Sequence, residues 1–227
     1  MTETSAATPP EIGLRERKKQ ETRRRIAETA RRLFTERGFD QVTVAEVARA
    51  ADVSTQTVFN YFATKEDLVY WRLGAFEEHL LAAVRDRPPG ESALAAFRGF
   101  LLEMRGLVRS PEPGAAEQLE AMTRMIAASP ALLAREQQIY AQYTDALAAL
   151  LAGETSADPG DVEPWIAANA QTGVHRALVA YVRGRVLDGA SHPELGDDTR
   201  ARAEHAFALL EHGLGAYAVK APERGGQ

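Results

Sequence analysis

Apolar side chains recur along most of the chain at the three- and four-residue spacing of α-helices, and no segment alternates convincingly as a β-strand does. Near the start, Ile26, Ala30, Leu33 and Phe34 share one helical face, and Gly38 follows as the residue that ends this helix. The same spacing predicts later helices at about residues 44–50, 55–61, 65–85, 92–108, 115–128, 130–152, 162–187 and 198–219. We therefore predict an all-α fold of about nine helices, with three short ones followed by six longer ones.

Capping residues and helix breakers set the boundaries of these elements. Thr64 and Asp67 have the spacing of a capping box, which predicts one continuous helix from there to about Arg85. A segment containing His192 and Pro193 separates the last two helices. The expected organisation is a disordered tail over residues 1–14, a helix-turn-helix domain over 15–64, a helical ligand-binding and dimerisation domain over 65–220, and a frayed end over 221–227.

Residues 43–62 carry the pattern that is most informative about function. Two short helices flank a turn from Ala51 to Ser54, while Val58 and Phe62 are spaced to pack inward. The residues left facing outward are Thr55, Gln56, Thr57, Phe59 and Asn60. Amide and hydroxyl groups beside an aromatic ring suit base edges and thymine methyl groups in a major groove. The pattern therefore predicts a DNA-binding helix-turn-helix, and an ordinary helical hairpin with a polar outer face is the alternative.

The distribution of charge supports the DNA-binding interpretation, although the net charge of the chain is −5. Residues 15–64 carry 11 Lys and Arg against 7 Asp and Glu, whereas residues 65–227 carry 16 against 23. The first helix begins with a basic cluster of Arg15, Arg17, Lys18, Lys19, Arg23, Arg24 and Arg25. Positive charge at a helix start opposes the helix dipole, so phosphate binding explains it better than helix stability does. Lys65 is a further candidate for a phosphate contact.

Residues 18–72 resemble the tetracycline-repressor (TetR) family of bacterial regulators. The resemblance rests on the basic first helix with Phe34 and Gly38, on the segments 43–48 and 53–62, and on the closing residues 65–68. It implies that Thr43, Tyr61 and Lys65 bind phosphate, and that Thr55, Gln56, Thr57 and Asn60 lie in the groove. Asp52 stands where the family usually has Gly, and Asp tolerates the left-handed conformation that the turn requires.

The resemblance also implies a homodimer that binds a palindromic operator in double-stranded DNA and responds to a small-molecule effector. The dimer interface is expected on the last two helices, at Leu178, Tyr181, Val182, Phe207, Leu210, Leu214 and Tyr217. Candidates for the effector site are Met104, Met122, Tyr143, Asn169, Thr172, His175 and Arg176. Arg176 would suit a carboxylate or phosphate on the effector. For each of these residues, a place in the ordinary helical core stays open as the alternative. Effector binding is expected to tilt the helix at 65–85.

Other functional classes find little support in the sequence. There is no cysteine, no His-Glu-x-x-His motif and no phosphate-binding Gly-Lys-Ser/Thr loop. We expect no catalysis, no cofactor and no metal site. No apolar stretch is long enough for a membrane span and no signal peptide is evident, which predicts a cytoplasmic protein without a membrane partner. Two alternatives remain, namely a helical small-molecule-binding protein that does not bind DNA, and a ligand-independent regulator or activator.

Overall fold

The computed structural model describes residues 13–103, 108, 113–190, 192–214 and 219–220, and these form two units that join between Val69 and Tyr70. The first unit contains α1 (Leu14–Arg37), α2 (Val44–Ala50), α3 (Thr55–Tyr61) and the 3-10 helix η1 (Glu66–Leu68). The second contains α4 (Leu73–Arg85), α5 (Ala93–Glu103), α6 (Ala115–Ala128), α7 (Pro130–Thr155), α8 (Glu163–Leu187) and α9 (His192–Leu214). Within the described ranges the fold is all-α with nine α-helices, as expected, and the β-structure there is one isolated bridge.

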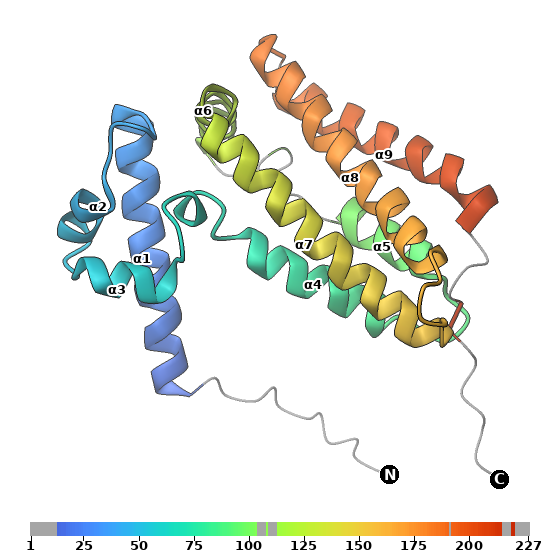
Figure 1. Ribbon diagram of the computed structural model, residues 1–227. Coiled ribbons are helices and arrows are strands. Elements are labelled where there is room, and N and C mark those ends of the chain that lie inside the picture. Colours follow the sequence, from blue (N-terminus) through green and yellow to red (C-terminus); the bar gives the residue numbers. More distant parts are fainter. Residues whose placement is uncertain (1–12, 104–107, 109–112, 191, 215–218, 221–227) are drawn as a thin grey trace, which may run out of the picture. The chain divides into compact units, whose positions relative to one another are not determined.

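The first unit consists of three helices around a small apolar core. The face of α1 that its periodicity marks as apolar is turned inward, so that Ile26 and Phe34 are buried. Val47 of α2 and Val58 of α3 are buried against the same core. Figure 1 shows α2 and α3 lying beside α1. Because two of these helices have only seven residues, most of their stability must come from this packing.

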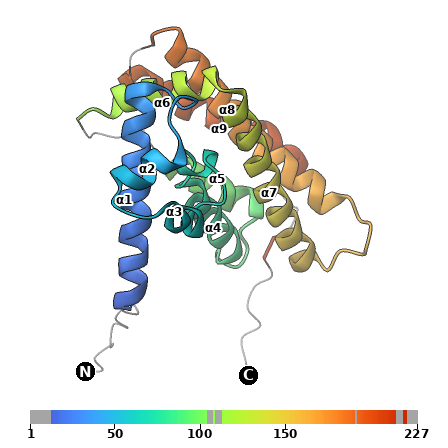
Figure 2. The same ribbon diagram turned by 60° about the vertical axis from the view of Figure 1, so that its left-hand side comes forward.

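The second unit is built around the long helices α7, α8 and α9. Figures 1 and 2 show α8 and α9 running side by side, with α7 along the other side of α8. Leu119 of α6, Val182 and Val186 of α8 and Leu195 of α9 form one buried apolar cluster. Among the described residues, no helix is both long and apolar enough to cross a membrane.

The expectation of one continuous helix from residue 65 to 85 is wrong. The capping box forms, because the Thr64 N–H donates to Asp67 Oδ2 (2.9 Å) and the Asp67 N–H donates to Thr64 Oγ1 (3.3 Å). It opens only η1, and α4 begins at Leu73. Between them, the buried Tyr70 donates its hydroxyl proton to the carbonyl oxygen of Leu132 in α7 (3.0 Å). This long-range contact fixes the chain where local sequence alone would have continued the helix.

Four other boundaries differ from those expected. The last helix begins at His192, six residues earlier than predicted, because Pro193 lies in its first turn, where a missing N–H has no intrahelical partner to lose. It ends at Leu214, and α5 ends at Glu103. The first helix starts at Leu14, inside the expected tail. The predictions for residues 1–12 and 221–227 lie outside the described residues.

A buried arginine fixes the C-terminal end of α4. The Arg87 side chain is 1% exposed, and its Nη2 lies 2.6 Å from Glu154 Oε2 near the end of α7. The same guanidinium donates to the carbonyl oxygens of Val84 and Glu91. A desolvated arginine needs this full set of acceptors, so the contact ties the last turns of α4 and α7 together.

The segment Val219–Lys220 closes over the loop that joins α4 to α5. The Gly90 N–H donates to the Lys220 carbonyl oxygen (2.7 Å), and the Lys220 N–H donates to the Glu91 carbonyl oxygen (3.2 Å). Lys220 Nζ lies 3.2 Å from the carbonyl oxygens of both Arg85 and Arg87. A cation in this position stabilises the C-terminal end of a helix, because it interacts favourably with the helix dipole. The C-terminal end of α4 is therefore held from two sides.

Replacing Glu154 by Ala should destabilise the second unit by about 3 kcal/mol, because it removes the carboxylate that pairs with the buried Arg87 guanidinium. Urea unfolding followed by circular dichroism measures this loss. The matched control is Glu120→Ala, which removes an exposed i,i+4 partner of Arg124 and should cost about 0.5 kcal/mol or less. Equal effects of the two substitutions would contradict the structural role given to Arg87.

Candidate nucleic-acid interface and effector site

The turn between α2 and α3 is short and well supported. Asp52 adopts the left-handed conformation (φ 54°) that was expected of it, and the Val53 N–H donates to the carbonyl oxygen of Ala48 (3.0 Å). Ser54 caps α3 by accepting from the Thr57 N–H (3.0 Å). The two helices of the predicted helix-turn-helix are thus fixed at a defined angle by local hydrogen bonds.

The outer face of α3 carries the polar side chains that the sequence placed there. Val58 is buried, whereas Gln56 and Asn60 on the opposite side are exposed. Gln56 Nε2 donates to Asn60 Oδ1 (3.2 Å), so the two amides are paired. Phe59 is 46% exposed although it is a large apolar residue. Thr55 is exposed as well, and Thr57 is partly buried.

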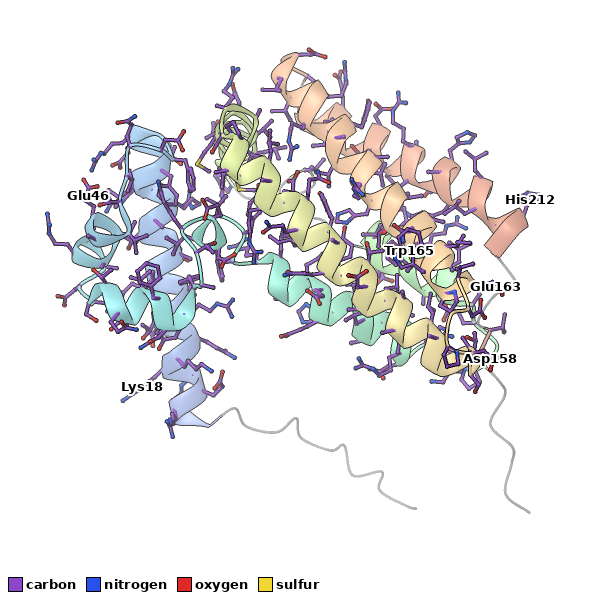
Figure 3. All side chains as sticks on the ribbon, viewed as in Figure 1. Lys18, Glu46, Asp158, Glu163, Trp165 and His212 are labelled. Atoms are coloured by element: carbon purple, nitrogen blue, oxygen red, sulfur yellow. The ribbon has the colours of Figure 1, made fainter. Side chains whose placement is uncertain are left out.

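Thr43 is fully engaged in the cap of α2. Its backbone N–H and its hydroxyl both donate to Glu46 Oε2 (2.8 Å each), and Arg37 Nη2 donates to Glu46 Oε1 (2.7 Å). Figure 3 labels Glu46 on α2, and its carboxylate is turned toward Thr43 and Arg37. These contacts hold the pKa of the Glu46 carboxyl down to about 2, with the Thr43 N–H as the largest cause. A phosphate contact by Thr43 stays a prediction and would compete with Glu46 for the same two donors.

The predicted phosphate-binding cations have different surroundings. Arg24 is exposed, with Nε 3.9 Å from Glu28 Oε1. Lys65 is partly buried, and its Nζ lies 4.1 Å from the centre of the Phe39 ring. Burial lowers the pKa of Lys65. Lys65 therefore supports the first unit structurally, whatever its role toward DNA, and this ring contact could not be predicted from the local pattern of residues. Tyr61 is partly buried.

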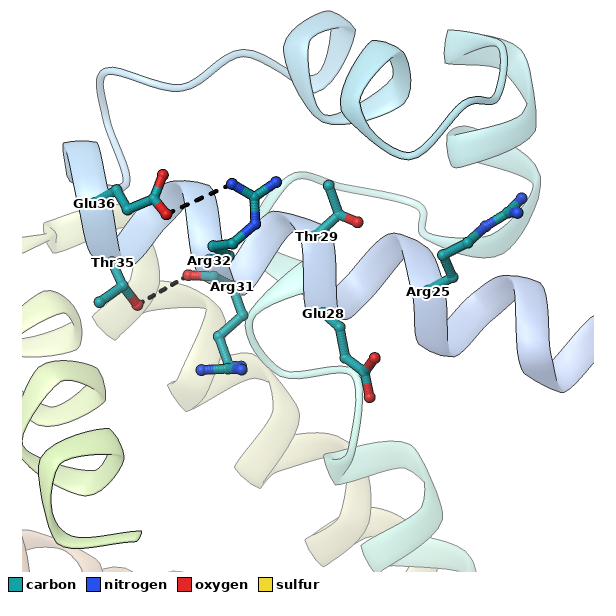
Figure 4. Close-up of a pocket in the computed structure, with 7 residues that line it drawn as sticks. All are labelled: Arg25, Glu28, Thr29, Arg31, Arg32, Thr35 and Glu36. Carbon is teal, nitrogen blue, oxygen red and sulfur yellow. Dashed lines mark hydrogen bonds and ion pairs between the residues drawn. The ribbon is translucent and has the colours of Figure 1, made fainter. Parts of the chain in front are cut away.

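A shallow depression runs along the surface of α1 (Figure 4). It is lined by Arg25, Glu28, Thr29, Arg31, Arg32, Thr35 and Glu36, all of them from this one helix. Arg32 and Glu36 form an exposed ion pair across it (3.5 Å). The lining is polar and carries both signs of charge, so it does not resemble the apolar site expected for an effector.

In the second unit, two predicted effector-site residues meet in an aromatic cluster. His175 Nδ1 of α8 lies 2.9 Å from the Tyr143 hydroxyl of α7. Phe76 of α4 stacks on the His175 ring (centroids 4.9 Å apart) and also contacts Phe100 of α5 (5.4 Å). The Tyr140 ring meets His175 edge-on. Burial lowers the pKa of His175 to about 4, so the imidazole is neutral at pH 7. Phe76, the ring that joins α4 to this cluster, was not among the sequence candidates.

Of the other effector-site candidates, Arg176 borders the aromatic cluster, with its guanidinium 5.6 Å from the centre of the Tyr140 ring, and the rest lie elsewhere. Thr172 is buried and its hydroxyl lies 3.0 Å from that of Thr144, which places it in the contact between α7 and α8. Arg176 is exposed and donates to Gln137 Oε1 (2.8 Å). Asn169 donates back to the main chain of its own helix at Trp165, while Met122 is partly buried on α6. Met104 lies outside the described residues. Their roles toward an effector stay predictions.

The predicted dimer residues divide in a similar way. Val182 and Phe207 are buried within the unit itself, Phe207 with its ring centre 6.0 Å from that of Phe97. Tyr181 donates its hydroxyl proton to Asp198. Leu178 and Leu210 are partly exposed. The side chains of Leu214 and Tyr217 lie outside the described residues.

Comparison with known proteins identifies the family. Residues 26–70 match the family described as bacterial regulatory proteins of the tetR family, and residues 92–214 match the MftR C-terminal domain. The chain belongs to the TetR family. It is 34% identical over 164 residues to the HTH-type transcriptional regulator TcmR of Streptomyces glaucescens, covering 70% of this chain and 72% of TcmR. It is 30% identical over 168 residues to the regulator MftR of Mycobacterium tuberculosis, covering 73% and 80% of the two chains.

The fold of this TetR-family chain also resembles solved structures. The structure of the SmeT–triclosan complex matches with a TM-score of 0.53 at 17% identity, over 92% of this chain and 98% of SmeT. Taken with the sequence relatives, this confirms the predicted family and fold. The chain is a transcriptional regulator with a DNA-binding helix-turn-helix.

The stability that Glu46 gives to α2 should disappear in acid. Its pKa is lowered from 4.5 to about 2 on folding, so this contribution is fully present above pH 4.5 and is lost as the pH falls toward 2. The melting temperature of Glu46→Gln should therefore lie below that of the parent at pH 7, with the difference vanishing near pH 2. A difference that did not depend on pH would show that the charge of Glu46 is unimportant for the cap.

Proposed function

We propose that the chain acts as a homodimeric repressor, which binds a palindromic operator in double-stranded DNA and leaves it when a small molecule binds the second unit. The outer face of α3 is the observation that carries this proposal. Its exposed amides project from a short helix whose opposite face is buried and whose N-terminus is capped by Ser54. Such a helix can enter a major groove without changing its own fold.

Selection from a random pool of double-stranded DNA with the purified chain tests this function directly. We expect the retained sequences to contain two inverted half-sites about one helical turn apart. No enrichment would favour a helical small-molecule-binding protein instead. A reporter gene placed behind the selected operator then separates a repressor from an activator, because a repressor lowers expression and an activator raises it.

Phosphate contacts by the basic start of α1 should make DNA binding steeply dependent on salt. Replacing Arg24 by Ala should weaken binding to operator and random DNA alike, and should reduce the slope of log affinity against log salt by about 0.9. The control is Arg124→Ala, which removes an exposed arginine in a similar i,i+4 ion pair but in the second unit. If Arg24→Ala and the control have the same slope, Arg24 makes no phosphate contact.

The proposed dimer surface lies on the exposed side of α8 and α9. Leu209 of α9 is 68% exposed, and Trp165 and Ile166 at the start of α8 are 55% and 52% exposed. Figure 3 shows Trp165 on α8 and His212 near the end of α9. Farther along α8, Gly173 and Ala177 are exposed and small enough for the helix of a second copy to approach closely. This surface supports a homodimer better than the buried Val182 and Phe207 do.

Leu209→Glu should therefore convert the dimer to a monomer, because each dimer would bury two carboxylates without partners. Sedimentation velocity at micromolar concentration measures the change. The control Ala127→Glu places the same charge at an exposed position of α6 and should remain dimeric. A dimeric Leu209→Glu variant with unchanged stability would exclude Leu209 from the interface.

The aromatic cluster around His175 is the proposed place of effector sensing. Phe76 links the cluster to α4. Tyr70, which lies just before α4, is the first residue of the second unit. Because Arg87 holds the far end of α4, an effector that separates Phe76 from His175 would displace the end of α4 near Tyr70 most strongly and would have to break the hydrogen bond from Tyr70 to Leu132. The DNA-bound state and the effector-bound state would then differ in the position of α4. Release from DNA by an effector requires such a difference in structure between the two states. Changed fluorescence of Trp71, next to Tyr70, on binding of co-purified small molecules would support this coupling.

A further inference from the structure

The exposed residues of α3 differ in chemical character from one side of the helix to the other. At 100° per residue, Gln56 and Asn60 lie on the side opposite the buried Val58 and Phe62. Phe59 flanks this pair on one side and Thr57 on the other. The most outward part of α3 is therefore an amide pair, with a phenyl ring at its edge.

From this surface we propose that α3 selects two closely spaced A·T base pairs, with Gln56 binding an adenine and Phe59 contacting the methyl group of a thymine within two base-pair steps of it. The assignment rests on the proposed function, since it specifies which bases the same DNA-binding surface prefers. It assigns Phe59 a part in sequence specificity.

The hydrogen bond between the two amides decides what each can offer to a base. Gln56 uses one N–H on Asn60 Oδ1, which leaves its second N–H and its carbonyl oxygen. Among the described residues these two groups have no other partner. One donor beside one acceptor matches adenine, which presents N7 as an acceptor and N6–H as a donor in the major groove. Asn60, whose oxygen accepts this hydrogen bond, holds the Gln56 amide in this orientation.

Phe59 supplies a different kind of recognition. Its ring is 46% exposed, cannot form a conventional hydrogen bond, and lies three residues from Gln56 on the same helix. The major groove presents one apolar group, the C5-methyl of thymine. Side chains three residues apart on a helix are separated by about 5–6 Å at Cβ, which corresponds to one or two base-pair steps. The adenine and the thymine methyl should thus lie within two steps of each other.

Modified bases test each contact separately with the full-length chain. In the operator selected from the random pool, each thymine is replaced in turn by deoxyuridine and each adenine by 7-deazaadenine. For the parent chain, one deoxyuridine position should weaken binding about fourfold, the value of one buried methyl group. One 7-deazaadenine position should weaken it about fivefold, the value of one hydrogen bond. The two positions should lie within two base pairs of each other.

The variants Phe59→Ala and Gln56→Ala complete the experiment. Phe59→Ala should bind thymine and deoxyuridine operators equally but keep its sensitivity to 7-deazaadenine, and Gln56→Ala should show the reverse. Phe59→Leu, which keeps an apolar side chain, should retain part of the sensitivity to the methyl group. If deoxyuridine does not weaken binding by the parent chain, or if it still weakens binding by Phe59→Ala, the assignment of Phe59 is overturned. A 7-deazaadenine effect that persists in Gln56→Ala overturns the assignment of Gln56. Failure of the pool to yield any preferred sequence would instead overturn the proposed function itself.

Discussion

A helix of seven residues is too short to persist in water, and the DNA-binding unit contains two of them. Side chains cap their N-terminal ends. Thr43 and Glu46 form the capping box of α2, and Ser54 caps α3. Their inner faces are used completely for burial, as at Val58. In these two helices, the residues outside the outer face are thus engaged in packing or capping. This division leaves the outer face of α3 free to interact with another molecule, and the rest of the unit serves to present it.

The DNA-binding unit was predictable from sequence because its determinants are local. The spacing of Val58 and Phe62, the cap at Ser54 and the turn at Asp52 all act within a few residues, and the structure confirms each of them. The break before α4 was not predictable in this way. The capping box at Thr64 is equally compatible with a single 3-10 turn, and the helix is interrupted by a contact from Tyr70 to Leu132, which is 62 residues away.

The second unit shows why core and surface could not be separated from the sequence. Val182 and Phe207 have the spacing of an interface, yet both are buried against helices of the same unit. Gly173 and Ala177, which are exposed, are too small to give a strong apolar signal. A helix that packs on two sides has two apolar stripes, and periodicity alone does not show which neighbour covers each. The pairing of Tyr143 with His175 likewise depends on how α7 and α8 align.

Buried polar groups of the second unit are distributed unevenly, and this bears on where it can change shape. Arg87 is fixed by Glu154 and by main-chain oxygens, so moving it would break several strong contacts at once. Around Phe76, by contrast, the contacts are between rings, and ring contacts can be exchanged for those of a bound aromatic or apolar molecule at little cost. Gln171 Oε1 is buried and has no hydrogen-bond partner among the described residues. In the proposed response to an effector, α4 would rotate about the end that Arg87 holds, exchanging the ring contacts of Phe76 and breaking the hydrogen bond from Tyr70 to Leu132.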